Sequence, residues 1–342
     1  MTINSITNKI NAIFIDLYKS IKKLNLITKL FLIFLILLFT HIIFNKTTKE
    51  NLDNNTDNVK YIKKIDNDIY DDYFTKKYDV LFLNNERNEF EVNNIKKVAK
   101  NKNNKILDVG CGTGLNVRLL NDMSYNIIGL DQSESMVNNA KKNNIKCKFI
   151  NGNILNNNLF DFNSFNIITC LGKTIYEIKN KDKFFENCYS LLEDNGLLIV
   201  NLVDRDKFKP YVQSKSSNIL FNPEEYKKKI ENLIVKFKDN LEFNSKYNLL
   251  TNKDDKDDID NKDNKDNKDK FNLTNDNVLP YSQYYDEFID DNNNKKVYEL
   301  NLYMPEKQII RKTAESHGFN FEDSISLNEI SHDNEYLYIF KK

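Results

Sequence analysis

The chain has 342 residues, of which 40% are hydrophobic, and this proportion is enough for a sizeable folded core. Lysines and arginines number 50, as do aspartates and glutamates, so the formal net charge of zero argues against a general nucleic-acid-binding protein. Four cysteines are too few for a disulfide scaffold, and none has the C-x-x-C spacing that structural zinc favours. We therefore expect neither a stapled secreted fold nor a metal site.

The first apolar run of the chain lies at residues 30–45 and contains no charged side chain. Its apolar part is short of the roughly 20 residues that span a bilayer, but residues 26–28 extend it. A cleavable signal peptide fits badly, because 29 residues precede the run and no small-residue cleavage site follows it. We predict a retained, single-pass transmembrane anchor at 30–45; a buried core helix or a re-entrant segment is the alternative.

Residues 1–29 have apolar side chains at every third or fourth position and lysines largely elsewhere, which predicts a basic amphipathic helix. It can lie in the headgroup region of a membrane, serve as a targeting segment, or pack on the globular domain. Five lysines against one aspartate give +4 before the anchor, whereas residues 46–60 sum to zero. The positive-inside rule then sends the C-terminal domain across the membrane, but four free cysteines favour the opposite side, so the side stays open.

Short apolar runs alternate with amphipathic stretches from residue 105 onward, and this alternation predicts an α/β fold with a parallel sheet. The predicted strands are 106–109, 127–130, 147–150, 165–169 and 197–203, and the predicted helices are 116–123, 133–143 and a third around 184–192 that stops at 195–196. In such a sheet the ligand lies at the carboxyl ends of the strands, so the residues that follow each strand matter most.

The rest of the chain is divided by composition. We predict a polar linker at 46–65, a core at 66–209, an inserted substrate-side subdomain at 210–304, and a C-terminal completion of the core at 305–342. Within the insertion, antiparallel strands are expected at 233–237, 241–250, 284–289 and 296–304, and the Lys-, Asp- and Asn-rich stretch 252–270 is expected to be disordered. The C-terminal part should hold a helix at 305–317 and strands at 319–325 and 336–340.

A glycine loop follows the first strand of the core. Gly110, Gly112 and Gly114 come after Asp108 with the spacing G-x-G-x-G, which lets the backbone turn tightly and approach a ligand at a helix N-terminus. A dinucleotide-binding loop is the competitor, but its third glycine would stand where this chain has Leu115. Asp131 ends the second strand about twenty residues later, where a carboxylate can accept hydrogen bonds from both hydroxyls of a ribose.

Together these residues resemble the class I S-adenosylmethionine-dependent methyltransferases, over about 70–204 and the tail from 303. The resemblance implies a seven-stranded Rossmann-like sheet, here with an inserted antiparallel β subdomain and an N-terminal transmembrane helix. It implies S-adenosyl-L-methionine as the cofactor, with the methionine part held by Asp108, Gly110, Cys111, Gly112 and Gly114. It further implies contacts to the ribose and adenine from Asp131, Gln132, Asn153 and Ile154, and a fourth-strand motif at Cys170 and Leu171.

A tyrosine-rich segment precedes the core, and the resemblance makes Tyr70, Tyr73 and Tyr78 candidates to close over the cofactor. Methyl transfer from a sulfonium is a direct displacement, so the protein mainly aligns the acceptor and excludes water. A general base helps only where the acceptor must lose a proton. Candidates for that role are Tyr176, Glu177, Asp204 and His317.

We therefore expect a membrane-anchored methyltransferase that acts on a small-molecule, lipid-like or protein acceptor. The sequence lacks the motifs of amino-directed and cytosine-directed nucleic-acid methylases, which argues against a nucleic-acid substrate. Two alternatives stay open. One is a noncatalytic methyltransferase-like module tethered to a membrane, and the other is a dinucleotide or nucleotide-sugar enzyme on a similar sheet.

Overall fold

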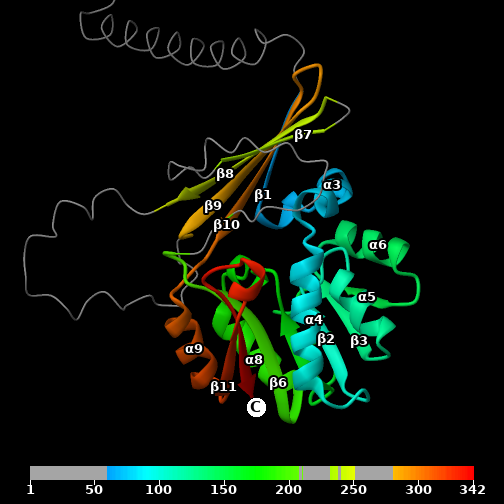
Figure 1. The fold of residues 1–342 in the computed structure, drawn as a ribbon, viewed down its shortest axis with the longest axis vertical. Helices are drawn as coiled ribbons and strands as arrows, with labels where there is room; N and C mark the ends of the chain where they lie inside the picture. The colour runs from blue at the N-terminus through cyan, green and yellow to red at the C-terminus, as the bar shows by residue number, and fades with distance from the viewer. Residues whose placement is uncertain (1–59, 208–209, 211–231, 238–239, 251–279) are drawn as a thin grey trace, which may run out of the picture. The chain divides into compact units, whose positions relative to one another are not determined.

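The computed structural model describes residues 60–207, 210, 232–237, 240–250 and 280–342 (Figure 1). The predicted anchor at 30–45, the amphipathic segment at 1–29 and the low-complexity stretch at 252–270 lie outside these residues. Among the helices that the structure describes, none has the length and apolar character needed to cross a membrane.

A seven-stranded sheet forms the centre of the described chain, with the order β11-β12-β6-β5-β2-β3-β4. Its strands are β2 (Lys105–Val109), β3 (Asn126–Asp131), β4 (Lys148–Asn151), β5 (Phe165–Cys170), β6 (Leu192–Val203), β11 (Asn320–Ser326) and β12 (Glu335–Lys341). Strands β2 to β6 pair in parallel, whereas β12 is antiparallel to both β6 and β11. The α/β fold and the terminal antiparallel pair are thus as predicted.

One boundary in this sheet differs from the prediction. The helix around 184–192 was expected to stop at 195–196, but it ends at Leu191, and β6 begins at Leu192. Leu192 pairs with Phe165 across the sheet before a register shift, and Gly196 lies within the strand. The Asn-Gly pair therefore marks an irregularity in a strand and not the end of a helix: Asn195 has a φ of 63°, and β6 pairs with β5 at Leu192 and again from Leu197.

Helices cover both faces of this sheet. They are α4 (Asn85–Ala99), α5 (Leu115–Asp122), α6 (Glu134–Asn143), α7 (Thr174–Glu177), α8 (Lys181–Leu191) and α9 (Lys307–Ser316), with short 3-10 turns η1 (Asp66–Ile69) and η4 (Asn328–Ile330), and α3 (Asp72–Phe82) before the core. Ile106 packs in one apolar cluster with residues of α4, α5 and α6, and its neighbour Leu107 packs in the other with residues of α8 and α9. Successive strand residues point to opposite faces, so both faces are buried.

A second, five-stranded sheet has the order β1-β10-β9-β8-β7. Its strands are β1 (Tyr61–Ile65), β7 (Asn232–Lys236), β8 (Glu242–Leu249), β9 (Ser282–Ile289) and β10 (Lys295–Leu302). The four strands predicted in the insertion are confirmed, each to within two residues, and they are antiparallel to one another.

The predicted linker at 46–65 needs correction, because residues 61–65 form β1 and pair in parallel with β10. The strand has no buried face, and Tyr61 is 57% exposed, so it carries no alternating apolar pattern. Backbone pairing and the ion pair of Lys63 with Glu299, at 2.7 Å, hold it on the sheet edge. The inserted subdomain therefore also includes a strand from before the core.

The two sheets are tied together where β10 ends. The backbone N–H of Tyr303 donates to the carbonyl of Tyr176 at 2.7 Å. The Lys181 ammonium donates to the carbonyls of Tyr303, at 2.7 Å, and of Ile178, at 2.8 Å. Lys181 is fully buried, and burial lowers its pKa to about 7. These bonds attach the five-stranded sheet to the segment that carries α7.

A buried charge network joins α4 to the sheet. The Arg87 guanidinium pairs with Glu91 at 3.0 Å and with Glu335 on β12 at 3.1 Å, and it donates to Asn201 on β6 at 3.1 Å. Glu335 is 1% exposed, and burial alone would raise its pKa, but Arg87, Lys173 and His332 hold that pKa at about 2. The positive charge of Arg87 keeps both of its buried counter-charges only while Glu335 is ionised.

Replacing Glu335 by Gln should lower the free energy of unfolding at neutral pH by about 3 kcal/mol, because Arg87 loses a buried counter-charge. The folded-state pKa of Glu335 lies below the ordinary 4.5, so its contribution is complete above that pH and is lost as the pH falls towards about 2. Urea unfolding of both proteins from neutral pH downward should show the difference shrinking. The control Glu315→Gln removes an exposed pair with Arg311 and should change stability by less than about 0.5 kcal/mol. Equal stabilities of Glu335→Gln and the unmodified protein at neutral pH would contradict this account.

Candidate functional site

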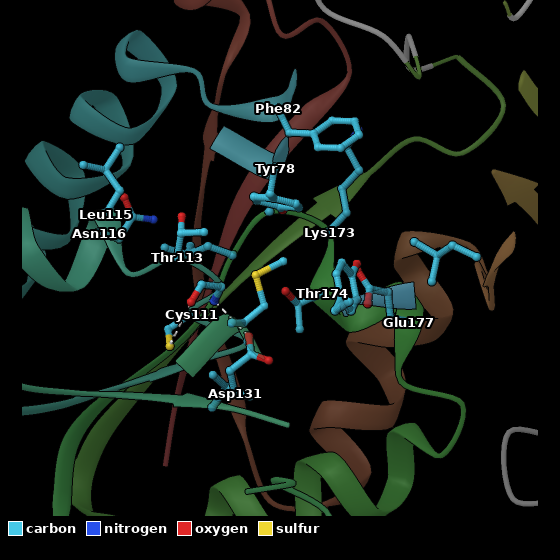
Figure 2. Close-up of a pocket in the computed structure, with 18 of the residues that line it drawn as sticks. Tyr78, Phe82, Cys111, Thr113, Leu115, Asn116, Asp131, Lys173, Thr174 and Glu177 are labelled. Carbon is cyan, nitrogen blue, oxygen red and sulfur yellow. Dashed lines mark hydrogen bonds between the residues drawn. The ribbon is translucent and has the colours of Figure 1, made fainter. Parts of the chain in front are cut away.

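A cavity of about 350 Å³ lies at the carboxyl ends of the central strands (Figure 2). The loops after β2, β3 and β5 line one part of it, and α3, α4 and residues of the five-stranded sheet line the rest. Residues of the predicted cofactor site that line it are Asp108, Gly110, Cys111, Gly112, Asp131, Gln132, Asn153, Ile154 and Leu171. The parallel sheet thus brings most of the predicted residues to one place.

The glycine loop has a backbone that other residues rarely adopt. Gly110, Gly112 and Gly114 have φ of 70°, 52° and 85°. A Cβ at Gly112 would meet no atom within 4 Å, so this glycine presents bare backbone to open space at the cavity. Such a surface suits a ligand that must approach the main chain closely. Gly114 does not line the cavity. A Cβ at this position would lie 2.6 Å from the Phe149 ring, so a glycine is needed for close packing at the start of α5.

Asp131 closes the glycine loop onto β3. Its two carboxylate oxygens accept hydrogen bonds from the backbone N–H groups of Gly112, at 2.8 Å, and Ser133, at 2.9 Å. Burial raises the pKa of Asp131, and these two bonds oppose that rise. Each oxygen keeps a second lone pair, so the carboxylate can still accept from ligand hydroxyls.

Asp108 lies beneath the loop at the end of β2. Its carboxylate accepts a hydrogen bond from the Thr169 hydroxyl at 2.7 Å, and burial raises its pKa to about 7. Gln132 and Asn153 form a polar rim, in which the Asn153 amide donates to the Gln132 side chain at 3.1 Å. The Cys111 thiol is also held neutral, because burial raises its pKa.

Cys170 is a correction to the predicted site. It is fully buried in the apolar cluster that contains Cys188, and it does not line the cavity, whereas Leu171 does. Adjacent residues at the end of a strand point in opposite directions, and here the first points into the core.

Of the four candidate bases, Glu177 alone lines the cavity. The Tyr176 hydroxyl accepts from the backbone of Val203 at 2.8 Å and is fully buried. Asp204 pairs with Lys307 at 3.3 Å, and His317 contacts Asp182 at 3.1 Å, both outside the cavity. These three residues therefore hold the fold together.

Glu177 is half-buried at the edge of the cavity. The Tyr70 hydroxyl donates to its Oε1 at 3.0 Å, and this is the one hydrogen bond of Glu177 within the part of the chain that the structure describes. Burial is the main cause that raises its pKa to about 8. The geometry leaves Oε2 available to a group in the cavity.

The aromatic residues of the tyrosine-rich segment fall into two groups, those that line the cavity and those that pack elsewhere. Tyr70 and Tyr78 line the cavity with Phe74 and Phe82. Tyr73 does not; it packs edge-on against Phe288 with ring centroids 5.3 Å apart, and the Lys296 ammonium lies over its ring at 3.5 Å. Helix α3 therefore presents some of its aromatic rings to the cavity and others to the five-stranded sheet.

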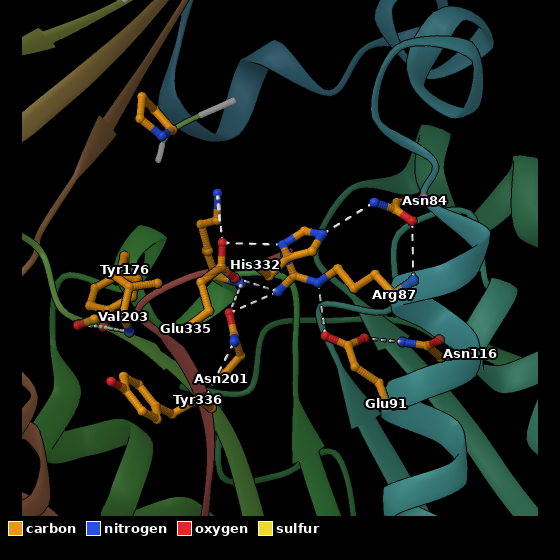
Figure 3. A network of polar contacts seen from close by, with 12 residues as sticks. Asn84, Arg87, Glu91, Asn116, Tyr176, Asn201, Val203, His332, Glu335 and Tyr336 are labelled. Carbon is orange, nitrogen blue, oxygen red and sulfur yellow. Dashed lines mark hydrogen bonds and ion pairs between the residues drawn. The ribbon is translucent and has the colours of Figure 1, made fainter. Parts of the chain in front are cut away.

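Several cavity residues were not anticipated. Arg87, Lys173 and His332 line the cavity and belong to the charge network described above, which Figure 3 shows reaching from α4 to β12. Asn116 also lines the cavity and donates to Glu91 of that network at 3.2 Å. Arg87 and Asn116 are polar residues on helices, which are typical of a solvent-exposed face, and Lys173 and His332 lie in connecting segments, so the sequence pattern did not indicate a role for any of them. A hint was Asn84, whose side chain accepts from the backbone of Arg87 at 3.1 Å and starts α4.

Comparisons with known proteins agree with this geometry. Residues 100–263 match a family model described as a methyltransferase domain. Phosphoethanolamine N-methyltransferase of Plasmodium falciparum is 27% identical over 178 residues, which make up 47% of this chain and 66% of that protein. A ubiquinone biosynthesis O-methyltransferase of Coxiella burnetii is 29% identical over 119 residues, 32% of this chain and 48% of that protein. The chain thus spans about half to two thirds of the length of these relatives.

Two solved structures share the fold. A S-adenosylmethionine-dependent methyltransferase from Clostridium acetobutylicum has a TM-score of 0.53 at 16% identity, with 79% of this chain and 97% of that chain covered. The CcbJ methyltransferase from Streptomyces caelestis has a TM-score of 0.53 at 13% identity, with 80% and 97% covered. Residues 100–263, which include the glycine loop and most of its sheet, thus form a methyltransferase domain, and its fold is shared with S-adenosylmethionine-dependent methyltransferases.

Proposed function

We propose that the protein transfers a methyl group from S-adenosylmethionine to a small-molecule acceptor that binds in the same cavity. The observation that carries the proposal is the shared cavity itself, lined by the glycine loop, by Asp131 and by the half-buried carboxylate of Glu177. Glu177 lines a cavity of about 350 Å³, a size that suits a small-molecule acceptor. The two relatives are named for N- and O-methylation, so they leave the acceptor atom open.

The residues around the loop fit the cofactor. The open side of Gly112 accommodates a group against the backbone, and Asp131 accepts hydroxyl hydrogen bonds beside it. When bound, S-adenosylmethionine supplies an electrophilic methyl group on a sulfonium. Gln132 and Asn153 offer amide groups at the rim for a nitrogenous base. Gly114 supports this site through the loop geometry, and Cys170 lies outside it.

Glu177 is the group best placed to accept a proton from the acceptor. Its Oε1 is oriented by Tyr70, and its Oε2 is free of other hydrogen bonds to described residues. A pKa of about 8 makes it a stronger base than an ordinary carboxylate and leaves part of it ionised near neutral pH. Tyr70 acts on the acceptor only through Glu177 and is a positioning residue.

We also propose that residues 30–45 anchor the enzyme in a membrane. The support comes from the uncharged apolar run and from the basic segment at 1–29, which would add a salt-sensitive attraction to anionic lipid. The side of the membrane on which the domain lies is left open by this proposal.

Changing Asp131 to Ala should weaken S-adenosylmethionine binding by at least about tenfold, because each lost charged hydrogen bond contributes roughly 1.5–3 kcal/mol. Calorimetric titration measures the affinity, and circular dichroism checks that the fold persists without the carboxylate that holds Gly112. Asp161→Ala, an exposed aspartate outside the cavity, is the control and should bind normally. Unchanged affinity in Asp131→Ala would remove the site assignment, and binding of a nicotinamide dinucleotide in place of S-adenosylmethionine would favour the nucleotide-enzyme alternative.

Changing Glu177 to Gln should lower turnover by roughly 100-fold or more and leave S-adenosylmethionine affinity unchanged, as expected for loss of a general base. In the unmodified enzyme the rate should rise as the pH passes through about 8, because Glu177 then loses its proton, and this rise should vanish in the variant. Transfer of labelled methyl groups to small-molecule, lipid and protein fractions gives the rates. Asp204→Asn is the control, since Asp204 is outside the cavity. Cofactor binding with no transfer to any fraction would instead support a noncatalytic module.

The anchor is tested by carbonate extraction of membranes that contain the full-length protein or a version lacking residues 1–45. Leu, Ile and Phe each favour insertion by about 0.3–0.6 kcal/mol at a helix centre, and no charge opposes them, so only the shortened protein should enter the soluble fraction. Release of the full-length chain would overturn the anchor and leave a core helix or a removed targeting segment.

A further inference from the structure

One acidic side chain lies on the face of the five-stranded sheet that meets the cavity. Asp286 on β9 stands opposite Ser245 on β8 and Tyr298 on β10. Opposed residues of paired strands share a face, so the register identifies the rest of that face. Its other large members on β7 to β10 are apolar or aromatic, apart from Lys296: Leu233, Val235, Phe243, Tyr247, Leu249, Tyr284, Phe288, Leu300 and Leu302. The Lys296 ammonium lies over the Tyr73 ring at 3.5 Å, and Lys64, which the edge strand β1 adds to this face, pairs with Asp71 at 2.8 Å. Asp286 is 6% exposed and lines the cavity.

Asp286 lacks a compensating cation. Its Oδ1 accepts a short hydrogen bond from the Ser245 hydroxyl, and its Oδ2 has no hydrogen-bond partner among the described residues. Burial raises its pKa to about 7, and no lysine, arginine or histidine of the described chain forms an ion pair with it. A buried, uncompensated carboxylate is costly. A neutral Asn could accept the same bond from Ser245, so the acid is unexplained by the fold alone.

The surroundings of the cavity are those of a cation site. Tyr70, Phe74, Tyr78 and Tyr284 line it and offer aromatic rings. Glu177 adds a second, half-buried carboxylate that forms no ion pair with a described residue. Arg87, Lys173 and His332 line the cavity too, but all three face Glu335, and Arg87 also pairs with Glu91.

We propose that the methyl acceptor is an amine, which enters the cavity as an ammonium ion and is held by Asp286. The inference rests on the methyltransferase function proposed above and names the acceptor class of that site. A neutral alcohol would leave Asp286 uncompensated, and an acceptor with an acidic group beside it would be repelled.

The chemistry balances with the residues present. The ammonium gives one proton to the Glu177 carboxylate, which leaves an amine nitrogen with a lone pair. That lone pair forms the new nitrogen–carbon bond to the methyl group, while the carbon–sulfur bond breaks and its electron pair goes to sulfur. The positive charge of the sulfonium thereby passes to the methylated nitrogen, which stays beside Asp286.

Matched amines and alcohols test the inference on the full-length protein in detergent. Benzylamine, phenethylamine and the corresponding alcohols are titrated by calorimetry in the presence of saturating S-adenosylhomocysteine, which prevents turnover. The unmodified protein should bind the amines at least about tenfold more tightly than the alcohols. Asp286→Asn should lose that preference and keep its affinity for S-adenosylhomocysteine. Glu287→Gln is the control, because Glu287 lies on the other face of β9 and pairs with Lys295 at 3.1 Å.

Each result of these titrations either supports or overturns the inference. Equal binding of amines and alcohols to the unmodified protein, or no binding of the amines at millimolar concentration, overturns the inference. An amine preference that persists in Asp286→Asn overturns the role of Asp286. Should Asp286→Asn fail to fold, the amine-to-alcohol ratio of the unmodified protein still tests the acceptor class. Failure of the methyltransferase proposal is distinct, because S-adenosylhomocysteine itself would then not bind.

Discussion

The shared end of three parallel strands is the constraint on which the rest of the site depends. Val109 of β2 lies in register with Leu130 of β3 and with Cys170 of β5, so the loops that follow all three begin at one edge. The N–H of Gly110 donates to the Leu130 carbonyl at 2.8 Å and thereby locks the glycine loop to β3. The loop, Asp131 and the segment that leads to Glu177 meet because their strands end together.

Residues of the five-stranded sheet line one part of the cavity at this edge. This sheet is attached at Tyr303, whose backbone bonds to Tyr176 and Lys181 on either side of Glu177. The same short segment therefore supports the five-stranded sheet and presents the Glu177 carboxylate to the cavity. Tyr176 contributes from beneath through its bond to Val203.

Four acidic side chains around the cavity make the stability of the folded protein depend on pH. Burial raises the pKa of Asp108 to about 7, of Asp286 to about 7 and of Glu177 to about 8, and it raises that of Asp131. The folded protein then binds more protons than the unfolded chain, so these groups reduce stability as the pH rises through that range. Glu335 acts oppositely, because Arg87 keeps it ionised. The acids around the cavity thus lower the free energy of unfolding as the pH rises, whereas the ionised Glu335, paired with Arg87, raises it.

The sequence by itself determined the central sheet, the antiparallel strands of the insertion, the glycine loop and Asp131, because each depends on local properties: hydrophobic period, glycine conformation and position after a strand. It did not reveal β1, which has no buried face, nor decide between Tyr176 and Glu177 or between Cys170 and Leu171, since neighbours differ only in direction. Tertiary structure alone brought Asp286 to the cavity and Arg87 to Glu335, partners 248 positions apart. A side chain's burial and its compensating charges come from distant segments, and no local pattern encodes them.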